Sequence, residues 1–479
     1  MRRPLQIAIA CVLTSAPVAY ADNLDFYGTA NGSVATTDNA NGLEAGKPGK
    51  RGDVFSDIRP GFLATYYAPR MIHELSSEVD FLYHIATARP TVTFRAGWKA
   101  FFIPSPRTEA TLNADASKGQ LNALSASASP LTDDVTSVLP PGRVDIESVT
   151  GSQNFSWVAS EGSRVWQRSF GRFGTTLDEA AGLEDVTTTS WEAGVALGLD
   201  HTLRHDNFVF EIGGSYVHME KLDPSSRQMG SRLDRQWNPR SVIVWQHDID
   251  KKWSSNIDVG GVYVVPTGCS TNPNDPTGPC VPDPYNPTQT RNNGFFPVFG
   301  GVAAYTDVWG RAQVAARRQV TPNLFIAQNT QSDSLTITAA MPLTIFDKDS
   351  NKEQPKVVGI GNAGIESTRL IDPTTGNLTS TFHVARIDFG VGWSPRPGQT
   401  LGLRYELTYQ NGTTAEADMV VPEFVRNTFY FTFSLRYPED ILVKVPRRNQ
   451  SVRADRKDLA PIGAEPVIVD PTEFLEGGR

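Results

Sequence analysis

The segment Asn427–Tyr437 constrains the fold more than any other part of the chain. Large apolar residues share one parity and mostly hydroxyl or charged residues share the other; the apolar set is Phe429, Phe431, Phe433, Leu435 and Tyr437. Successive side chains of a strand point to opposite faces, so this period of two predicts a strand with one apolar and one polar face. Such a strand suits a membrane-spanning barrel or one sheet of a soluble sandwich.

The same alternation recurs along the chain, for example at 191–200, 208–216, 387–393 and 401–410. Many of these segments are about ten residues or longer, the length that a tilted membrane strand requires, whereas strands of soluble proteins average about five or six residues. Aromatic residues such as Trp191, Trp393 and Tyr409 lie towards segment ends, as in the interfacial girdles of membrane barrels. These features favour the barrel.

We therefore predict an all-β fold, a single-chain antiparallel transmembrane β-barrel of 14–18 strands, with 16–18 as the best estimate. Alternation is weakest at 108–126, 150–158 and 310–341. The candidate strands are 24–36, 54–68, 73–87, 91–103, 108–126, 150–158, 163–173, 186–200, 206–219, 233–248, 252–265, 295–308, 310–320, 323–341, 355–368, 381–394, 399–411 and 424–437.

The amino terminus has the features of a secretory signal peptide. Arg2 and Arg3 precede an apolar stretch, and Ala19-Tyr20-Ala21 forms a small-x-small cleavage pattern. We predict a signal peptide over residues 1–21 that is cleaved after Ala21. The chain would then be exported, with residues 22–437 forming a barrel in the bacterial outer membrane.

The signal peptide, the alternation and the aromatic last strand together resemble those of bacterial outer-membrane β-barrels, over about residues 24–437. The resemblance implies that the barrel is surrounded by outer-membrane lipid. It also implies that the assembly machinery recognises the last strand through Phe429, Phe431, Phe433, Leu435 and Tyr437. The chain departs from this pattern by continuing beyond Tyr437.

Residues 438–479 carry five prolines and charges of both signs, a composition that predicts a flexible periplasmic tail. Two roles remain open for this tail. It is either an overhang without a partner or a segment that docks on peptidoglycan or on a periplasmic export protein.

Cys269 and Cys280 lie in a segment rich in Pro, Asn, Asp and Gly between Pro266 and Asn293. In an oxidising compartment, such a pair predicts a disulfide. No histidine lies between or beside the two cysteines, so we predict no metal site there.

The sequence offers little support for catalysis or for nucleic-acid binding. Asp200-His201 and Asp133-Asp134 are candidates for the Asp–His pair and the acidic pair of outer-membrane proteases. We interpret them as ordinary charged residues in turns instead. We find no phosphate-binding, zinc or calcium motif, and we predict no catalytic residue and no cofactor. With 44 basic and 52 acidic residues, the chain lacks the basic surface that binds nucleic acid.

The polar parity of the candidate strands includes many charged residues, which we predict to line the lumen; these are Arg95, Lys99, Glu192, Glu211, Asp258, Arg386, Asp388, Arg404 and Glu406. A wet, charged lumen favours a passive conduit. Export of a polysaccharide together with a periplasmic partner and general diffusion of solutes are both compatible with it. A structural or adhesive surface protein is a third possibility, for which Phe295 and Phe296 are the one apolar indication.

Lumen shape separates the two kinds of conduit. A diffusion porin usually carries a segment folded into its lumen, whereas a polymer exporter requires a wide path without a constriction. Thr37–Asp53 and Ser127–Val149 are the candidate constriction loops, although neither is richly charged.

Overall fold

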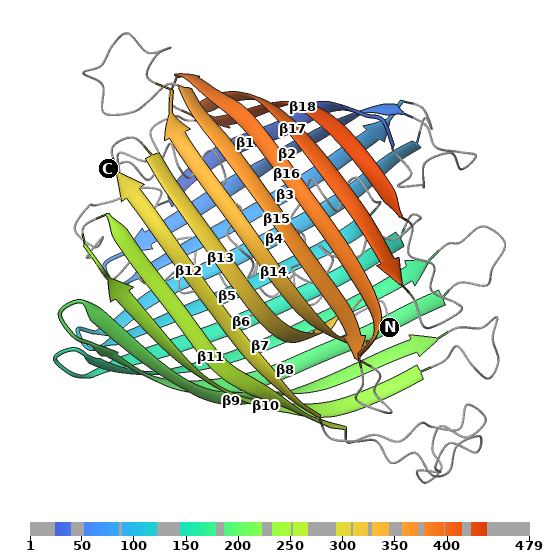
Figure 1. Ribbon diagram of the computed structural model, residues 1–479. Helices are drawn as coiled ribbons and strands as arrows, with labels where there is room; N and C mark the ends of the chain where they lie inside the picture. Colours follow the sequence, from blue (N-terminus) through green and yellow to red (C-terminus); the bar gives the residue numbers. More distant parts are fainter. Residues whose placement is uncertain are drawn as a thin grey trace, which may run out of the picture.

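The computed structural model consists of one closed sheet of eighteen antiparallel strands (Figure 1). It describes residues 24–39, 52–85, 89–121, 144–178, 186–222, 232–250, 252–266, 294–307, 310–323, 328–343, 357–371, 378–396, 398–413 and 423–437. The strands are β1 (Leu24–Thr37), β2 (Asp53–Ala68), β3 (Met71–His84), β4 (Arg89–Ser105), β5 (Thr108–Leu121), β6 (Val144–Ser160), β7 (Ser163–Asp178), β8 (Val186–Thr202), β9 (Asp206–Leu222), β10 (Arg232–Asp248), β11 (Trp253–Pro266), β12 (Gly294–Asp307), β13 (Gly310–Asn323), β14 (Gln328–Pro342), β15 (Val357–Ile371), β16 (Leu378–Arg396), β17 (Gln399–Thr413) and β18 (Phe424–Tyr437).

The first and last strands close the barrel. β1 pairs with β18 from Gly28 opposite Tyr437 to Thr37 opposite Thr428, and it pairs with β2 on its other side. Every other strand pairs with its two neighbours in the chain. The predicted antiparallel barrel is confirmed, with a strand number at the upper end of the predicted range.

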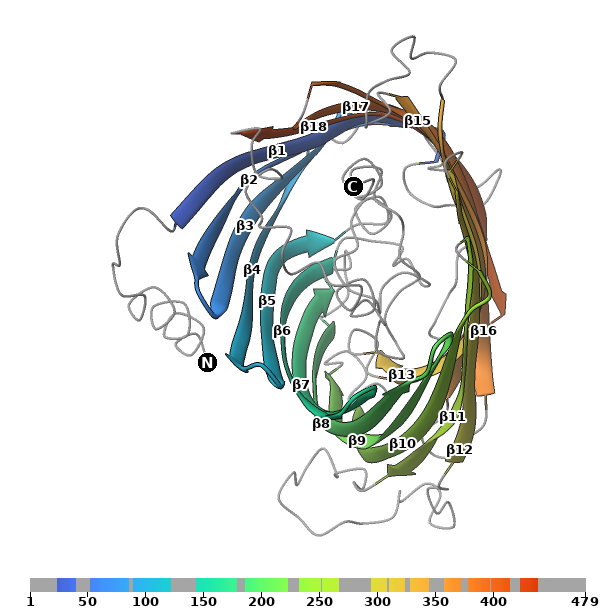
Figure 2. The same cartoon turned by 90° about the vertical axis from the view of Figure 1, so that its left-hand side faces the viewer.

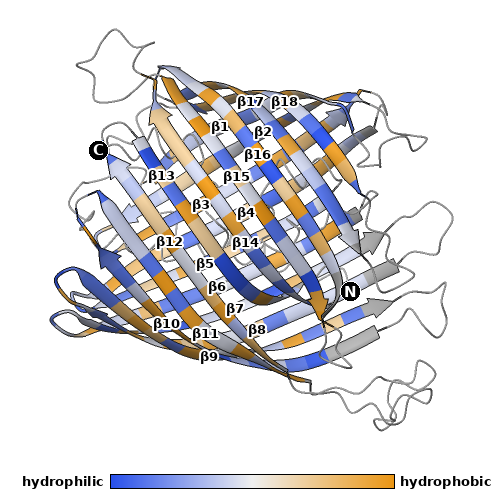
Figure 3. Ribbon diagram, viewed as in Figure 1, coloured by the Kyte–Doolittle hydropathy of each residue, from blue (hydrophilic) through white to orange (hydrophobic). Residues whose placement is uncertain are grey.

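Hydrophobic and hydrophilic residues alternate along many strands (Figure 3), so the two faces of the sheet differ in chemistry, as the period of two predicts. At mid-height of β18, Phe431 is 47% exposed, and its register partners Val34 and Leu403 are 49% and 65% exposed. Arg426 and Thr428, of the opposite parity, are buried. Large apolar side chains that face outwards and polar side chains that face inwards are the arrangement of a barrel whose outer solvent is lipid.

Aromatic side chains form clusters near both ends of the barrel wall. Near one end, Trp191 and Tyr216 have ring centroids 5.3 Å apart, and Tyr216 lies 5.1 Å from Trp237. Near the other end, His73 stacks on Trp98 at 6.0 Å. These clusters correspond to the interfacial girdles of membrane barrels, where rings with polar edges sit at headgroup level.

Among the described residues, no helix is long and apolar enough to cross a membrane.

The lengths of the connections between strands distinguish the two ends of the barrel. At one end, successive strands are joined by short turns at 69–70, 106–107, 161–162 and 397–398, although the β14–β15 connection at 343–356 is long. At the other end, the connections include 38–52, 122–143 and 267–293. Because outer-membrane barrels carry short periplasmic turns and long extracellular loops, we call these the turn end and the loop end. β1 begins and β18 finishes at the turn end.

The short turns use residues suited to tight connections. Gly162, between β6 and β7, has φ +79°, and Gly398, between β16 and β17, has φ +72°. Only glycine adopts this conformation without steric cost. Between β10 and β11, the Asp250 carboxylate accepts backbone hydrogen bonds from Lys252 at 2.6 Å and Trp253 at 2.8 Å. These hydrogen bonds lower the pKa of Asp250.

Some predicted boundaries were wrong, and others fall where the structure describes nothing. β6 begins at Val144, so the predicted strand at 150–158 is too short and the predicted loop Ser127–Val149 is too long. Polar residues on both faces of β6 hide its alternation. The signal peptide (1–21), the Cys269 and Cys280 pair and the tail (438–479) lie outside the described residues, so all three stay predictions.

Candidate functional site in the lumen

The loop ends of β13, β14 and β15 leave the barrel wall. Pairing between β12 and β13 starts at Asp307 opposite Gly310 and stops at Phe299 opposite Arg318, whereas β13 and β14 stay paired up to Asn323 and Gln328. We call residues 319–323, 328–332 and 370–371 the inner tip. In the end-on view of Figure 2, the end of β13 lies inside the ring of strands.

Apolar contacts hold the inner tip against the lumen side of β10, β11 and β12. Ile371 belongs to a buried cluster with Val242, Val262, Val264, Phe296 and Val298, and Val320 packs against this cluster. Val320 shares the parity of Val314, which is exposed on the outside of the same strand. The face of β13 that is exposed on the outside at Val314 therefore contacts the lumen side of the wall at Val320. This is possible only if the tip folds inwards.

Polar contacts across the lumen complete the attachment. The Gln236 and Asn329 side chains exchange two amide hydrogen bonds of 2.7 Å, which join β10 to β14. Arg172 of β7 donates to the carbonyl of Pro322 on β13 at 3.2 Å. In a closed barrel, contacts between strands that are not neighbours can form only through the lumen. The polar parity of β7 and β10 thus faces inwards.

Replacing Gln236 by Leu is expected to destabilise the docked tip by about 1–3 kcal/mol, because the buried Asn329 amide loses its partner. The double change of Gln236 and Asn329 to Leu removes both polar groups and should cost less. Single-channel recordings measure the difference as current fluctuations, which should be most frequent in the single variant. Equally quiet recordings from both variants would contradict a docking role for this amide pair.

The sequence contains an indication of this arrangement that the period-of-two argument missed. Towards the loop end, β11 and β12 are apolar on both faces, as in Val262-Tyr263-Val264-Val265, and β10 has a similar stretch at 242–245. The β14 part of the tip is polar on both faces, as in Gln328-Asn329-Thr330-Gln331-Ser332. A wall apolar on its lumen side needs a cover, and a strand polar on its outer side is unsuited to lipid. The weak alternation at 310–341 has this cause.

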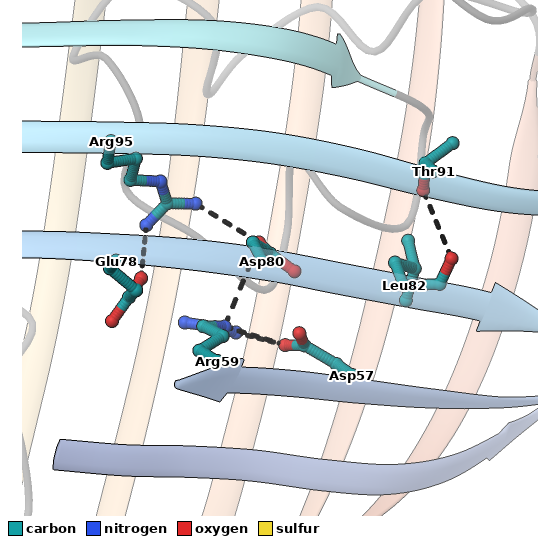
Figure 4. A network of polar contacts seen from close by, with 7 residues as sticks. All are labelled: Asp57, Arg59, Glu78, Asp80, Leu82, Thr91 and Arg95. Atoms are coloured by element: carbon teal, nitrogen blue, oxygen red, sulfur yellow. Dashed lines mark hydrogen bonds and ion pairs between the residues drawn. The ribbon is translucent and has the colours of Figure 1, made fainter. Parts of the chain in front are cut away.

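A network of ion pairs lines β2, β3 and β4 (Figure 4). Arg59 binds Asp57 at 2.8 Å through Nε and lies 3.8 Å from Asp80. Arg95 contacts Asp80 at 3.3 Å and Glu78 at 3.4 Å. Two guanidinium groups and three carboxylates alternate here, which compensates charge in a confined space and fixes the side chains against the wall.

Similar networks lie on the other parts of the wall. On β16 and β17, Arg404 contacts Asp388 at 2.5 Å and Glu406 at 3.2 Å. On β7, β9 and β10, Arg168 contacts Glu211 at 3.3 Å, and Arg240 binds the same carboxylate oxygen. The lumen therefore carries charges of both signs in close pairs, with no one-signed face among these networks.

The remaining predicted lumen residues have the same parity as these groups. Glu192 pairs with Arg172 at 2.5 Å. Lys99 stands opposite Asn113 and is exposed, Asp258 is buried beside Gly300, and Arg386 is half-buried. Sequence reasoning did not anticipate the partners Arg59, Arg168 and Arg240, because pairing across strands depends on register.

The residues considered for catalysis, adhesion and assembly have ordinary contacts with neighbouring strands where the structure describes them. Asp200 pairs with Arg164 at 3.0 Å, and His201 contacts Ser163 at 2.9 Å, while Asp133 and Asp134 lie outside the described residues. Phe295 is exposed on the outside, whereas Phe296 is buried in the cluster under the tip.

In the last strand, Phe429, Phe431 and Leu435 are exposed, and the Phe433 ring covers Gly32 on β1. The structure describes the backbone of Tyr437 but not its side chain. The described residues contain no cluster of three or more His, Cys, Asp or Glu side chains that could hold a metal ion.

The sequence matches no protein-family model and no curated protein. Among solved structures, the chain is similar to OccK2 (OpdF) of Pseudomonas aeruginosa, with 9% identity, a TM-score of 0.43, and coverage of 86% of this chain and 98% of that chain. A BenF-like porin from Pseudomonas fluorescens gives 8% identity, a TM-score of 0.42 and coverage of 86% and 98%. The FrpB iron transporter from Neisseria meningitidis gives 7% identity, a TM-score of 0.48 and coverage of 86% and 66%.

At these identities and TM-scores, the likeness carries no argument about substrate. The assignment rests on the chain's own pairing, its apolar outer belt and its charged lumen. The chain is an eighteen-stranded β-barrel of the outer-membrane type, whose lumen holds the inner tip near the loop end.

Proposed function

We propose that this barrel is a passive diffusion channel for small water-soluble solutes. The observation that carries this proposal is the inner tip, which is held inside the lumen by the Gln236–Asn329 amide pair with β10 and by the Arg172–Pro322 contact with β7. A barrel of about sixteen to eighteen strands leaves an aqueous channel. A segment fixed across that channel narrows it and sets an upper limit on solute size.

Export of a polysaccharide is less well supported. A polymer needs a continuous wide path, and the tip occupies part of that path at the loop end. The paired charges of the wall favour a hydrated lumen that admits small polar solutes of either sign, because the three networks together hold five guanidinium groups and six carboxylates. A lumen of this kind favours general diffusion, and it does not require a dedicated export partner.

Purified full-length protein in planar bilayers tests the proposal. We expect stepwise ion conductance, and in liposome-swelling assays we expect passage of monosaccharides but exclusion of long dextrans. Passage of long dextrans would instead support the polymer conduit. An absence of conductance steps from correctly folded protein would favour the structural or adhesive alternative.

A further inference from the structure

Strand β7 presents a column of alternating cationic and aromatic side chains to the lumen. Its members are Arg164, Trp166, Arg168, Phe170 and Arg172, which share one parity. Arg172 faces inwards, since it reaches Pro322 across the lumen, so the other four do as well. Trp166 and Phe170 are half-buried rather than covered. Large aromatic side chains facing an aqueous lumen require an explanation, because they would be more stable on the lipid side.

Both rings lie where the neighbouring strand has no side chain. A Cβ atom at Gly198 would come within 2.1 Å of the Trp166 ring, and one at Gly194 would come within 2.5 Å of the Phe170 ring. Because these two glycines of β8 have no side chain, the rings can lie close against the backbone of the wall. Backbone covers one side of each ring, and both rings keep part of their surface exposed on the lumen side.

The guanidinium groups above and below the rings are already compensated. Arg164 pairs with Asp200 at 3.0 Å, and Arg172 pairs with Glu192 at 2.5 Å. Arg168 contacts Glu211 at 3.3 Å and lies 5.9 Å from the centroid of the Trp166 ring. The column therefore offers hydrogen-bond donors and acceptors side by side, and each guanidinium has a carboxylate of its own except Arg168, which shares Glu211 with Arg240.

The chemistry of the column matches one class of solute. A pyranose ring has an apolar C–H face that packs on an aromatic ring, and its hydroxyl groups are both donors and acceptors. Paired guanidinium and carboxylate groups can satisfy such hydroxyls on both sides of the ring. Four column members, from Arg164 to Phe170, lie between the turn end and the contact of Arg172 with the inner tip. A solute on the column would therefore be positioned next to the constriction.

We infer that the Arg164–Arg172 column of β7 is a binding site for neutral sugars, in which Trp166 and Phe170 stack on pyranose rings. The inference rests on the proposed diffusion function, because the site is useful only if solute enters the lumen. It goes beyond that function by assigning a solute class and the residues that bind it.

The test is a titration of ion current through single channels with three probes: maltotriose, mannitol and benzoate. Maltotriose carries pyranose rings, mannitol has comparable hydroxyls without a ring, and benzoate is an aromatic anion. We expect maltotriose to block the current in a saturable way and mannitol to have no such effect. Exchanging both Trp166 and Phe170 for Ala should raise the half-blocking concentration of maltotriose about fivefold or more.

Two further variants separate the site from general effects on the lumen. Phe101 of β4 is also half-buried on the lumen parity but belongs to a different wall, so Phe101→Ala should leave the block unchanged. Trp166→Phe retains a ring and should restore most of the block if the alanine variant folds poorly.

The outcomes distinguish this inference from the function on which it rests. Ion current without a maltotriose block, or a block that the Trp166 and Phe170 changes leave unaltered, would overturn the sugar site and leave the channel intact. A stronger block by benzoate that depends on Trp166 would replace it with a site for aromatic anions. An absence of ion current would contradict the diffusion channel itself.

Discussion

Removal of the β13 and β14 parts of the inner tip is expected to raise the single-channel conductance severalfold and to increase the size limit for uncharged solutes. Arg318 and Asp333 are register partners on β13 and β14, so residues 319–332 can be replaced by an Asn-Gly pair, which favours a two-residue hairpin turn. The change deletes Val320, Pro322 and Asn329 and with them the attachments to β7 and β10 and the Val320 contact with the apolar cluster, whereas Ile371 of β15 stays. Conductance rises because the narrowest section of a pore dominates its resistance.

The chain provides a matched control for this deletion. Asn323 and Gln328 are also register partners, so replacing only residues 324–327 by Asn-Gly shortens the same connection and keeps every described contact of the tip. This control should conduct like the unaltered protein. Equal conductance of all three proteins would show that the tip does not limit the pore. A large increase in the control alone would place the limit in residues 324–327.

Phe431→Arg is expected to destabilise the folded barrel by about 2–4 kcal/mol, the cost of a basic residue on the lipid face at the bilayer midplane. Phe431 lies near the middle of β18, is 47% exposed, and has Val34 and Leu403 as neighbours on the outer face. Neither Val34 nor Leu403 has a polar group that could pair with the introduced guanidinium group. Unfolding by urea in lipid bilayers, followed by the shift between folded and unfolded mobility on a denaturing gel, measures the free energy.

Thr432→Arg is the control for the lipid-face substitution. Thr432 is the next residue of the same strand and has the lumen parity of Thr428 and Ser434. A long cationic side chain there can reach water, so we expect a much smaller loss of stability. A similar loss in both variants would contradict the assignment of the two faces of β18.

The sequence predicted the barrel because lipid and water impose the same local rule on every strand. In β18, the choice between an apolar and a polar residue at each position depends only on the face, and this rule is visible without knowledge of any partner. The charged lumen residues on β8, β16 and β17 followed from the same parity argument. Where both faces are polar, as in β6, apolar and polar residues no longer alternate visibly. The predicted strand there was therefore too short.

The sequence by itself determined the strand periodicity, the polarity of the two faces and the closed antiparallel class, because these depend on each residue's contact with lipid or water. Only the tertiary structure decided which charges pair and where the lumen narrows. Arg168 and Arg240 share Glu211 through the registers of β7 to β10, and no local pattern encodes a register. The inner tip is stable because apolar lumen-side residues of β10 to β12 are covered by Val320 of β13 and Ile371 of β15, which reach this wall only because the tip folds inwards.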